Sequence, residues 1–360
     1  MSPNSENYQE IIAQIKNLKR CTKCLMPQTV DGITFDEDGV CSLCRDFKKN
    51  DDIDFFEREK ELAELFNRFK NKGRGKYDCL VPYSGGKDST YVLYICKKYG
   101  MTPLAFNFNN HFHTRIGNLN MENMVRKIGA DLSQYAPNWH TAKKLCLKGI
   151  DQSGDFCWFC NCGGFANSVA AAVKEGIPLV VFGEDFVGGE KDFDSTQMFK
   201  KIFREACQHG VDESHYADEK IKLEELYPYQ LPSDAALDSL KVVYLGSYIK
   251  WNKFEILEFI KAHLGWQEAD PRDADFNSKN EHIDCKFAAV KEYMKYLKRG
   301  YGTNTEQASE KIRLGVISRA EALAEIEKDA VEPRNLADLL AMLDLTREQF
   351  IAMTIKNRKY

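Results

Sequence analysis

The chain has 360 residues, a formal net charge of −4 and 12 cysteines. This length suits two or three domains, and the slightly acidic balance argues against a protein that coats nucleic acids. The N-terminus is polar and no apolar run reaches membrane-spanning length, so we expect a cytoplasmic protein whose cysteines are free or bind metal rather than form a disulfide scaffold.

Four cysteines in two pairs dominate the first fifty residues. A short helix is predicted before them, because Ile11, Ile15 and Leu18 recur at near-helical spacing. The cysteines follow the pattern CxxC-x16-CxxC, which suits a tetrahedral four-thiolate zinc site; the alternative is reduced, unliganded thiols. Between the pairs, residues 33–35 are predicted to form a short strand. A closed site leaves no coordination position for chemistry, so we expect a structural zinc ribbon held by Cys21, Cys24, Cys41 and Cys44.

The most informative stretch is a glycine turn between a short apolar run and a run of helical character. The run at 79–81 predicts a strand and the run at 91–96 a helix, an order that places backbone N–H groups and a helix N-terminus around a phosphate. Lys87 adds a positive charge, and Asp88 makes sense beside a phosphate if Mg²⁺ lies between them. The alternative is an ordinary turn at the end of a buried strand. The stretch reads Tyr83, Ser84, Gly85, Gly86, Lys87, Asp88, Ser89 and Thr90.

Strands and helices alternate around this turn, which predicts an α/β fold with a parallel, doubly wound sheet. Ligands of such sheets bind beyond the carboxyl ends of the strands, so the turn and the segment from Asn107 to His113 should share one crevice. In that segment His111 and His113 either contact substrate or form a solvated loop pair. Further strands are expected at 104–108, 131–135, 177–182 and 242–248, and helices at 54–69, 116–128, 138–148, 165–174 and 254–263.

A second cysteine cluster, Cys157, Cys160 and Cys162, has the spacing CxxCxC and is flanked by glycines. The cluster has too few ligands to close a tetrahedron without help from elsewhere, such as Cys285 or a histidine. Our first interpretation is a tight loop that shapes a site. The alternatives are a metal or iron–sulfur cluster, a reactive thiol, or small buried side chains.

The strand predicted at 177–182 is followed by Glu184 and Asp185, which could orient Mg²⁺ or the acceptor, or cap the next segment. Residues 188–240 are polar and irregular, which indicates an insertion. Beyond 265 the pattern is helical, with capping boxes at 318–321 and 346–349. We therefore expect three parts: a zinc ribbon with a helix (1–50), a nucleotide-binding domain (51–265) and a helical domain (266–360).

The motif Ser84-Gly85-Gly86-x-Asp88-Ser89 resembles that of the PP-loop ATP pyrophosphatases. With the ribbon, the CxxC stretch and a helical tail that opens on Asp284-Cys285-Lys286, the chain from Arg20 to about Ala322 is similar to the N-acetyl sugar amidotransferases of surface-polysaccharide biosynthesis. The resemblance implies cleavage of ATP between its α- and β-phosphates. It also implies conversion of an acetamido group to an acetamidino group, in making lipopolysaccharide O-antigen or a related nonulosonic acid.

The resemblance also implies roles for individual residues. Lys87, Asp88, Glu184 and Asp185 are expected to be catalytic, with Asp88 holding Mg²⁺. Asn107 joins the stretch 83–90 as a residue expected to bind ATP. For Lys286, the alternative to a substrate contact is a solvated charged face. The residues expected to contact the sugar are Asn109, His111, His113, Cys157, Cys160 and Lys286.

The source of ammonia is expected to be a separate protein. No cysteine stands in a Gly-x-Cys-x-Gly pattern typical of a nucleophile elbow, so the chain is predicted to lack its own glutaminase. The family implies partners that resemble the two subunits of imidazole glycerol phosphate synthase. The alternative function is sulfur transfer to RNA by a PP-loop enzyme, in which Cys157 or Cys160 carries a persulfide or an iron–sulfur cluster. The acidic balance argues against it.

Overall fold

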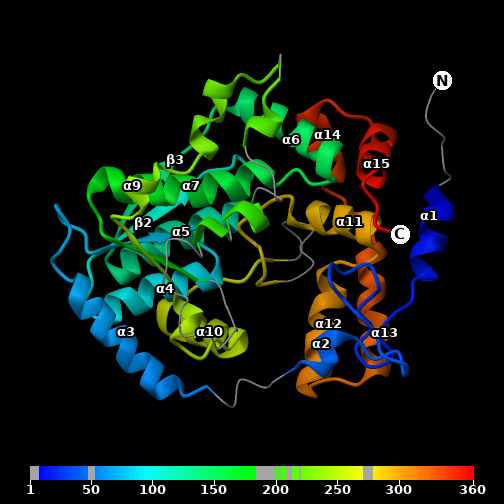
Figure 1. The fold of residues 1–360 in the computed structure, drawn as a ribbon, viewed down its shortest axis with the longest axis horizontal. Helices are drawn as coiled ribbons and strands as arrows, with labels where there is room; N and C mark the ends of the chain where they lie inside the picture. Colours follow the sequence, from blue (N-terminus) through cyan, green and yellow to red (C-terminus); the bar gives the residue numbers. More distant parts are fainter. Residues whose placement is uncertain are drawn as a thin grey trace. The chain divides into compact units, whose positions relative to one another are not determined.

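The computed structural model describes residues 8–47, 53–183, 199–201, 203–207, 213–218, 220–270 and 279–360. The chain forms two compact units (Figure 1). We call one the ribbon unit (Met1–Asp51, Cys146–Cys157 and Phe287–Tyr360) and the other the sheet unit (Asp52–Leu145 and Trp158–Lys286). The three-part division at residues 50 and 265 stays a prediction.

The sheet unit is built on five parallel strands in the order β3-β2-β1-β4-β5. The central strand β1 pairs with β2 through Leu80 and Leu104, and with β4 through Leu80 and Val180. Continuous apolar runs make such strands, because both faces of a parallel sheet are covered. This topology confirms the doubly wound α/β fold. The strands are β1 (Cys79–Pro82), β2 (Pro103–Phe108), β3 (Asp131–Tyr135), β4 (Leu179–Phe182) and β5 (Lys241–Tyr244).

Helices cover both faces of this sheet (Figure 1). Successive side chains of a strand point to opposite faces, so Val81 and Val181 join one core while Leu80 and Val180 join the other. The first core also contains side chains of α3 (Phe55–Phe69), α4 (Lys87–Lys98), α5 (Arg115–Ile128) and α10 (Lys253–Phe259). The second contains side chains of α7 (Trp158–Glu175) and α9 (Asp234–Leu237).

The ribbon unit is helical outside its cysteine-rich segment, as predicted for the C-terminal region. The capping boxes at Ser318 and Thr346 are confirmed, each side chain accepting from the backbone N–H three residues on. Its helices are α1 (Tyr8–Lys16), α2 (Ser42–Arg45), α11 (Ala288–Arg299), α12 (Thr303–Leu314), α13 (Arg319–Ile326), α14 (Leu336–Leu343) and α15 (Arg347–Ile355). The remaining helical segments of the described chain are α6 (Trp139–Ser153), η2 (Phe203–Cys207), η3 (Glu213–Tyr216), η4 (Leu223–Tyr229), η5 (Leu245–Ser247), η6 (Ile260–Leu264) and η7 (Glu327–Ala330).

The second cysteine cluster does not form the tight loop we predicted. α7 begins at Trp158, so Cys160 and Cys162 lie within its first turns. Gly163, a turn signal in the sequence, lies inside the helix, where a Cβ would come within 2.2 Å of the Phe108 ring on β2. The glycine therefore serves close approach of helix to sheet rather than a turn.

Two strand predictions also need correction. Residues 33–35 form no strand: only Phe35 pairs, in an isolated bridge with Cys41, because Asp36 turns the chain at once by accepting from the backbone N–H of Val40 (2.7 Å). The strand predicted at 242–248 ends at Tyr244, where the 3₁₀ turn η5 begins.

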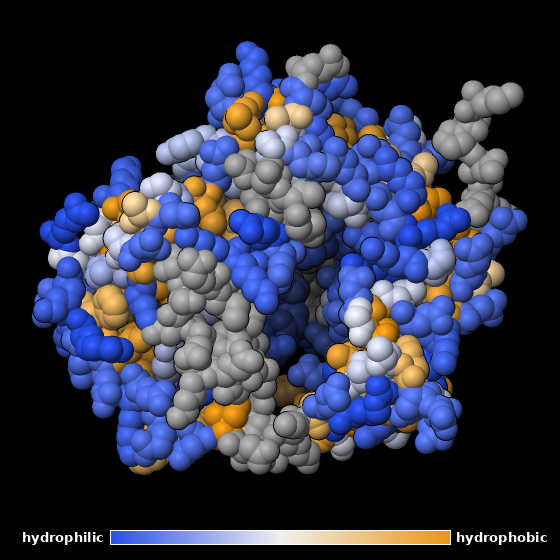
Figure 2. Space-filling view, viewed as in Figure 1, coloured by the Kyte–Doolittle hydropathy of each residue, from blue (hydrophilic) through white to orange (hydrophobic). Residues whose placement is uncertain are grey.

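Figure 2 shows mainly hydrophilic residues over the visible face of the described chain, with hydrophobic ones scattered among them. Within the described ranges, no single helix has both the length and the apolar composition to cross a bilayer. Only α6 and α7 taken together meet that requirement, and a sharp bend separates them.

Candidate functional site

The glycine turn lies between β1 and α4, as the sequence predicts. Gly85 has a φ of 82°, a conformation that glycine adopts without strain. Gly86 is the N-cap of α4, and no side chain caps this helix end. The first N–H groups of α4 therefore remain available to an anion, with the positive end of the helix dipole behind them.

Two serines define the shape of this loop. Ser84 Oγ accepts from the backbone N–H of Gly86 (3.2 Å), and Ser89 Oγ accepts from the backbone N–H of Ser84 (3.3 Å). The two hydroxyl oxygens lie 3.5 Å apart. On the far side, Tyr83 is buried with its hydroxyl 3.5 Å from that of Thr90. Hydroxyls and backbone N–H groups thus converge on one small volume, a geometry suited to phosphate oxygens.

Lys87 does not reach out of the loop. Its side chain is 3% exposed, and its ammonium lies 2.8 Å from Asp88 Oδ2 and 2.7 Å from Glu281 Oε2. Burial alone would lower the pKa of Lys87, but the carboxylates of Asp88 and Glu281 outweigh it and raise the pKa above its ordinary value. Lys87 is therefore a buried cation that holds two carboxylates.

Asp88 is held at both oxygens. Lys87 contacts Oδ2, and the indole N–H of Trp251 donates to Oδ1 (3.2 Å). A carboxylate has about four lone-pair positions, so these two contacts leave acceptor capacity for a cation. Asp88 is also 39% exposed, which fits the predicted role as an oxygen ligand of Mg²⁺.

Asn107 lies behind the loop rather than in it. Its side-chain amide donates to the carbonyl of Tyr83 (2.8 Å), and its oxygen accepts from Gln134 (2.8 Å). The residue is buried. The structure thus gives it the position of a brace that fixes the carboxyl end of β1.

The segment after β2, residues 109–114, carries the residues expected to contact the acceptor, and we call it the acceptor segment. Asn109 donates its backbone N–H to the carbonyl of Tyr135 (2.8 Å) and its side chain accepts from the N–H of His111 (2.9 Å). His111 has a φ of 67° and its Nε2 lies 2.8 Å from the carbonyl oxygen of Pro137. The ring and the backbone of His111 are therefore both held by local contacts.

His113 is the more enclosed of the two histidines. Its Nδ1 lies 3.2 Å from Asn118 Oδ1. Burial lowers its pKa below the ordinary value, partly opposed by the nearby carboxylate of Asp284 and the contact with Asn118. The imidazole is thereby biased toward its neutral form.

Residues 281–286, which we call the strap, bring distant side chains to both segments. The N–H of Lys286 donates to the carbonyl of Phe112 (2.7 Å), and Cys285 pairs with His113 in an antiparallel bridge. The backbone of Asp284 packs on α5 so closely that a Cβ on Gly117 would lie 2.7 Å from its Cα. Lys286, expected to contact substrate, thus adjoins the acceptor segment.

The remaining predicted site residues fall in three places. Cys160 belongs to the same neighbourhood, since Asn110 Nδ2 donates to its sulfur (3.1 Å). Cys157 belongs to the ribbon unit, where its N–H donates to Asp155 (2.7 Å). Glu184 and Asp185 lie outside the described residues.

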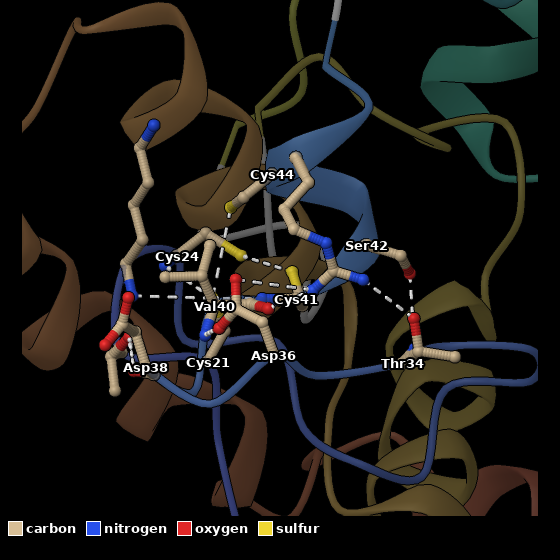
Figure 3. Close-up of polar contacts among 12 residues, drawn as sticks. Cys21, Cys24, Thr34, Asp36, Asp38, Val40, Cys41, Ser42 and Cys44 are labelled. Atoms are coloured by element: carbon tan, nitrogen blue, oxygen red, sulfur yellow. Dashed lines mark hydrogen bonds and ion pairs between the residues drawn. The ribbon is translucent and has the colours of Figure 1, made fainter.

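The four N-terminal cysteines form a separate, buried cluster in the ribbon unit (Figure 3). Their sulfur atoms all lie within 4.8 Å of one another, with Cys24 and Cys41 at 3.5 Å and Cys21 and Cys44 at 3.9 Å. A tetrahedral zinc with bonds of about 2.3 Å requires sulfur atoms about 3.8 Å apart. The arrangement is that of a metal site, and its donor set fits zinc.

Backbone donors distinguish one thiol of this cluster. Burial would raise the pKa of Cys21, but N–H groups of Cys24, Cys41 and Lys23 point at its sulfur and lower the pKa to about 7. For Cys41 burial dominates and raises the pKa to about 11. A thiolate next to neutral thiols is a suitable start for metal capture, because binding displaces the remaining protons.

Three neighbours of the loop were not predicted. Glu281 lies 194 positions from Lys87 and in a polar stretch with no local signal. Gln134 is a polar residue on the outer strand β3, and Trp266 donates its indole N–H to the carbonyl of Gly85 (2.9 Å). The aromatic N–H donors Trp251 and Trp266 each follow a strand or helix end, a position that could have suggested a site.

Comparison with known proteins gives partial matches. A curated relative, an uncharacterized protein of Methanocaldococcus jannaschii, is 29% identical over 115 residues, which are 31% of this chain and 41% of that protein. The chain thus spans about two fifths of the length of the curated relative that it matches.

Solved structures with some similarity include two synthetases. NMN synthetase from Francisella tularensis has 11% identity and a TM-score of 0.38, over 78% of this chain and 94% of that one. An NH3-dependent NAD synthetase from Campylobacter jejuni, in complex with nitrate, has 12% identity and a TM-score of 0.32, over 77% and 96%.

The most specific match lies at the C-terminus. Residues 276–360 match the family described as "LPS biosynthesis protein WbpG-like, C-terminal domain". The matched range includes the strap and the helices α11 to α15. This part of the chain is therefore similar to the C-terminal domain of WbpG-like lipopolysaccharide biosynthesis proteins.

Proposed function

We propose that the chain is an ATP-dependent amidotransferase of lipopolysaccharide biosynthesis. It converts the acetamido group of an N-acetyl sugar to an acetamidino group, with ATP split into AMP and pyrophosphate. O-antigen or nonulosonic acid sugars are the proposed substrate class, and the cytoplasm, where ATP is made available, is the proposed location. The C-terminal domain match supports the pathway, and the loop geometry supports the use of ATP.

One observation supports the proposal that the chain uses ATP. The loop at 84–89 combines an uncapped helix N-terminus, two serine hydroxyls 3.5 Å apart and a partly exposed carboxylate held at both oxygens. The N–H groups and hydroxyls suit pyrophosphate, while the carboxylate suits the Mg²⁺ that accompanies it. A buried turn with only a structural role would not hold a carboxylate beside an anion site.

The proposed reaction needs two displacements. The amide oxygen of the acetamido group attacks the α-phosphorus of ATP, and the bond from that phosphorus to the pyrophosphate oxygen breaks. Ammonia then adds to the activated carbon, AMP leaves with the former amide oxygen, and loss of a proton gives the amidine. The first step makes a good leaving group of a poor one.

The residues of this chain supply position and charge for these steps. Backbone N–H groups of the loop and the hydroxyls of Ser84 and Ser89 would hold the leaving pyrophosphate, where preorganised donors stabilise developing charge. Mg²⁺, held by Asp88, would supply neutralisation of phosphate charge when bound. His113, biased toward the neutral imidazole, lies on the acceptor segment in a form able to accept a proton from the attacking nitrogen.

The decisive assay measures pyrophosphate release from ATP. We expect pyrophosphate release to require an N-acetyl sugar, as the nucleotide-linked form, and repeated turnover to require ammonium salt as well, with AMP then formed in equal amount. Mass spectrometry of the sugar should show replacement of oxygen by NH. Absence of pyrophosphate with every nucleotide-linked N-acetyl sugar would contradict the proposal.

A second candidate is sulfur transfer by a PP-loop enzyme. It is favoured by Cys160, a partly exposed thiol in the first turn of α7 that accepts from Asn110 beside the acceptor segment. In that case Cys160→Ser should abolish turnover and anaerobically purified protein should contain iron or a persulfide. In the amidotransferase, Cys160→Ser should retain ATP cleavage and the protein should contain only the ribbon metal.

A further inference from the structure

A continuous series of polar contacts runs from the acceptor segment through the strap to the loop at 84–89. The series ends at Asp88, whose two oxygens are held by different donors, Lys87 and Trp251. A carboxylate fixed in this way has one orientation in which its remaining lone pairs can meet a cation. Groups that orient a metal ligand commonly matter nearly as much as the ligand.

Lys87 can orient Asp88 only if its own position is fixed. The ammonium is enclosed, with Asp88 on one side and Glu281 on the other. Glu281 is 23% exposed, and its Oε2 lies closer to the ammonium (2.7 Å) than Asp88 does (2.8 Å). Without the Glu281 carboxylate, the buried ammonium of Lys87 would lose one of these two contacts, and its long, flexible side chain would be held less firmly.

Glu281 itself belongs to a segment that is anchored elsewhere. Thr114, the N-cap of α5, donates its backbone N–H to the carbonyl of Asp284 (3.1 Å) and its hydroxyl to the carbonyl of Ile283. Lys286 donates to Phe112 in the same way. The strap therefore cannot shift without disturbing the acceptor segment, and its position is passed to Lys87 through Glu281.

We propose that Glu281 is a positioning residue, which orients the Asp88 carboxylate for Mg²⁺ through Lys87 and ties that orientation to the acceptor segment. This inference rests on the proposed function, because it assigns Mg²⁺·ATP to the loop. It adds a residue that lies outside the loop motif, 194 positions from Lys87. It also gives the strap a role, which is to couple the position of the acceptor segment to that of the loop at 84–89.

The test titrates Mg²⁺ into the full-length chain with α,β-methylene-ATP, which cannot be cleaved between the α- and β-phosphates. Calorimetry gives the Mg²⁺ concentration for half-maximal binding of the analogue and its affinity at saturating Mg²⁺. We expect Glu281→Gln to raise that Mg²⁺ midpoint about tenfold, the scale on which ligand-orienting groups act, while affinity at saturating Mg²⁺ changes little. The matched control is Glu258→Gln on α10, which removes a carboxylate from an exposed pair with Lys261 (3.4 Å) and should leave the midpoint unchanged.

Each outcome separates the proposals. A purely structural role for Glu281 would weaken analogue binding equally at low and high Mg²⁺, and that result would overturn the inference. An unshifted midpoint in Glu281→Gln, with Mg²⁺-dependent binding in the unaltered chain, would overturn the inference alone. No Mg²⁺-dependent binding in the unaltered chain would overturn the proposed function and the inference with it.

A second variant covers the case in which Glu281→Gln does not fold. Glu281→Asp keeps the charge but is one methylene shorter, so its carboxylate should lose direct contact with Lys87. We expect a shift of the Mg²⁺ midpoint in the same direction and smaller than that of the Gln variant. A midpoint equal to that of the unaltered chain would count against Glu281.

Discussion

The loop at 84–89 approaches α5 closely at Gly85, which has no Cβ. Its φ of 82° belongs to a region that residues with a Cβ rarely adopt. A Cβ there would lie 2.7 Å from the carbonyl oxygen of Gly117 and 3.0 Å from Cβ of Met121. Because these neighbours include the backbone of a packed helix, moving them aside would cost free energy.

We therefore expect Gly85→Ala to lower the free energy of unfolding by about 1–3 kcal/mol, the cost of a strained backbone conformation, and to weaken binding of α,β-methylene-ATP. Urea unfolding and calorimetry measure the two effects. The control is Gly164→Ala in α7, where no atom lies within 4 Å of the added Cβ. That helical position should gain about 0.5–1 kcal/mol. Equal stability of the Gly85 variant and the unaltered chain would show that the loop can relax.

At the residue scale, contiguous motifs were predictable and distant partners were not. The residues at 83–90 follow one another, so their order alone indicated strand, turn and helix. The sequence assigned Lys87 to phosphate charge, whereas the structure places its ammonium between Asp88 and Glu281. That contact depends on a fold that brings residue 281 back to residue 87, which no local pattern encodes.

Among the elements, the cysteine ribbon depends most on a bound group. Its core consists of the four thiols with Met26 and Tyr301, and the apolar side chains packed against it are only partly buried. Because four thiols make up most of this small core, we expect a bound metal to contribute much of its stability. Tyr301 lies just before α12, so the cluster also packs on the helical part of its own unit.

The purified chain is therefore expected to contain one zinc ion, measured by atomic emission. Cys41→Ser should lose that zinc and lower the first thermal unfolding transition, and a strong chelator should do the same to the unaltered chain. Cys146→Ala, which alters a buried cysteine of the same unit outside the cluster, should keep its zinc. Full zinc content in Cys41→Ser would exclude the cluster as the metal site.

The prediction of helices and strands succeeded where the apolar residues followed one clear periodicity. It failed where packing in the fold overrode a local sequence signal. The strands β1 to β4 and the amphipathic helices α3 and α5 lie within a residue or two of their predicted bounds. α7 begins seven residues before its predicted start because Gly163, which reads as a turn, permits contact with Phe108. This contact joins residues 55 positions apart in the sequence, so it cannot be predicted from the glycine alone.

For the molecule as a whole, the proposed reaction requires a source of ammonia. Outside the four-cysteine cluster, Cys157, Cys160 and Cys285 are partly exposed, while Cys79, Cys96, Cys146 and Cys162 are buried. None stands in an elbow pattern in the sequence. A glutaminase nucleophile needs a base that activates its thiol, and Cys160 instead accepts from the amide of Asn110.

We therefore expect the purified chain to use ammonium salt but not glutamine as its nitrogen donor. With ATP and the acceptor sugar present, glutamine alone should yield no glutamate above background, while ammonium salt should support amidine formation. Because free ammonia is the nucleophile, the rate at fixed total ammonium should rise with pH as its unprotonated fraction grows. Addition of a separate glutaminase with an ammonia-channelling subunit should restore glutamine use at low ammonium. Glutamate formation by the chain alone, lost in Cys160→Ser, would mean that the molecule carries its own glutaminase.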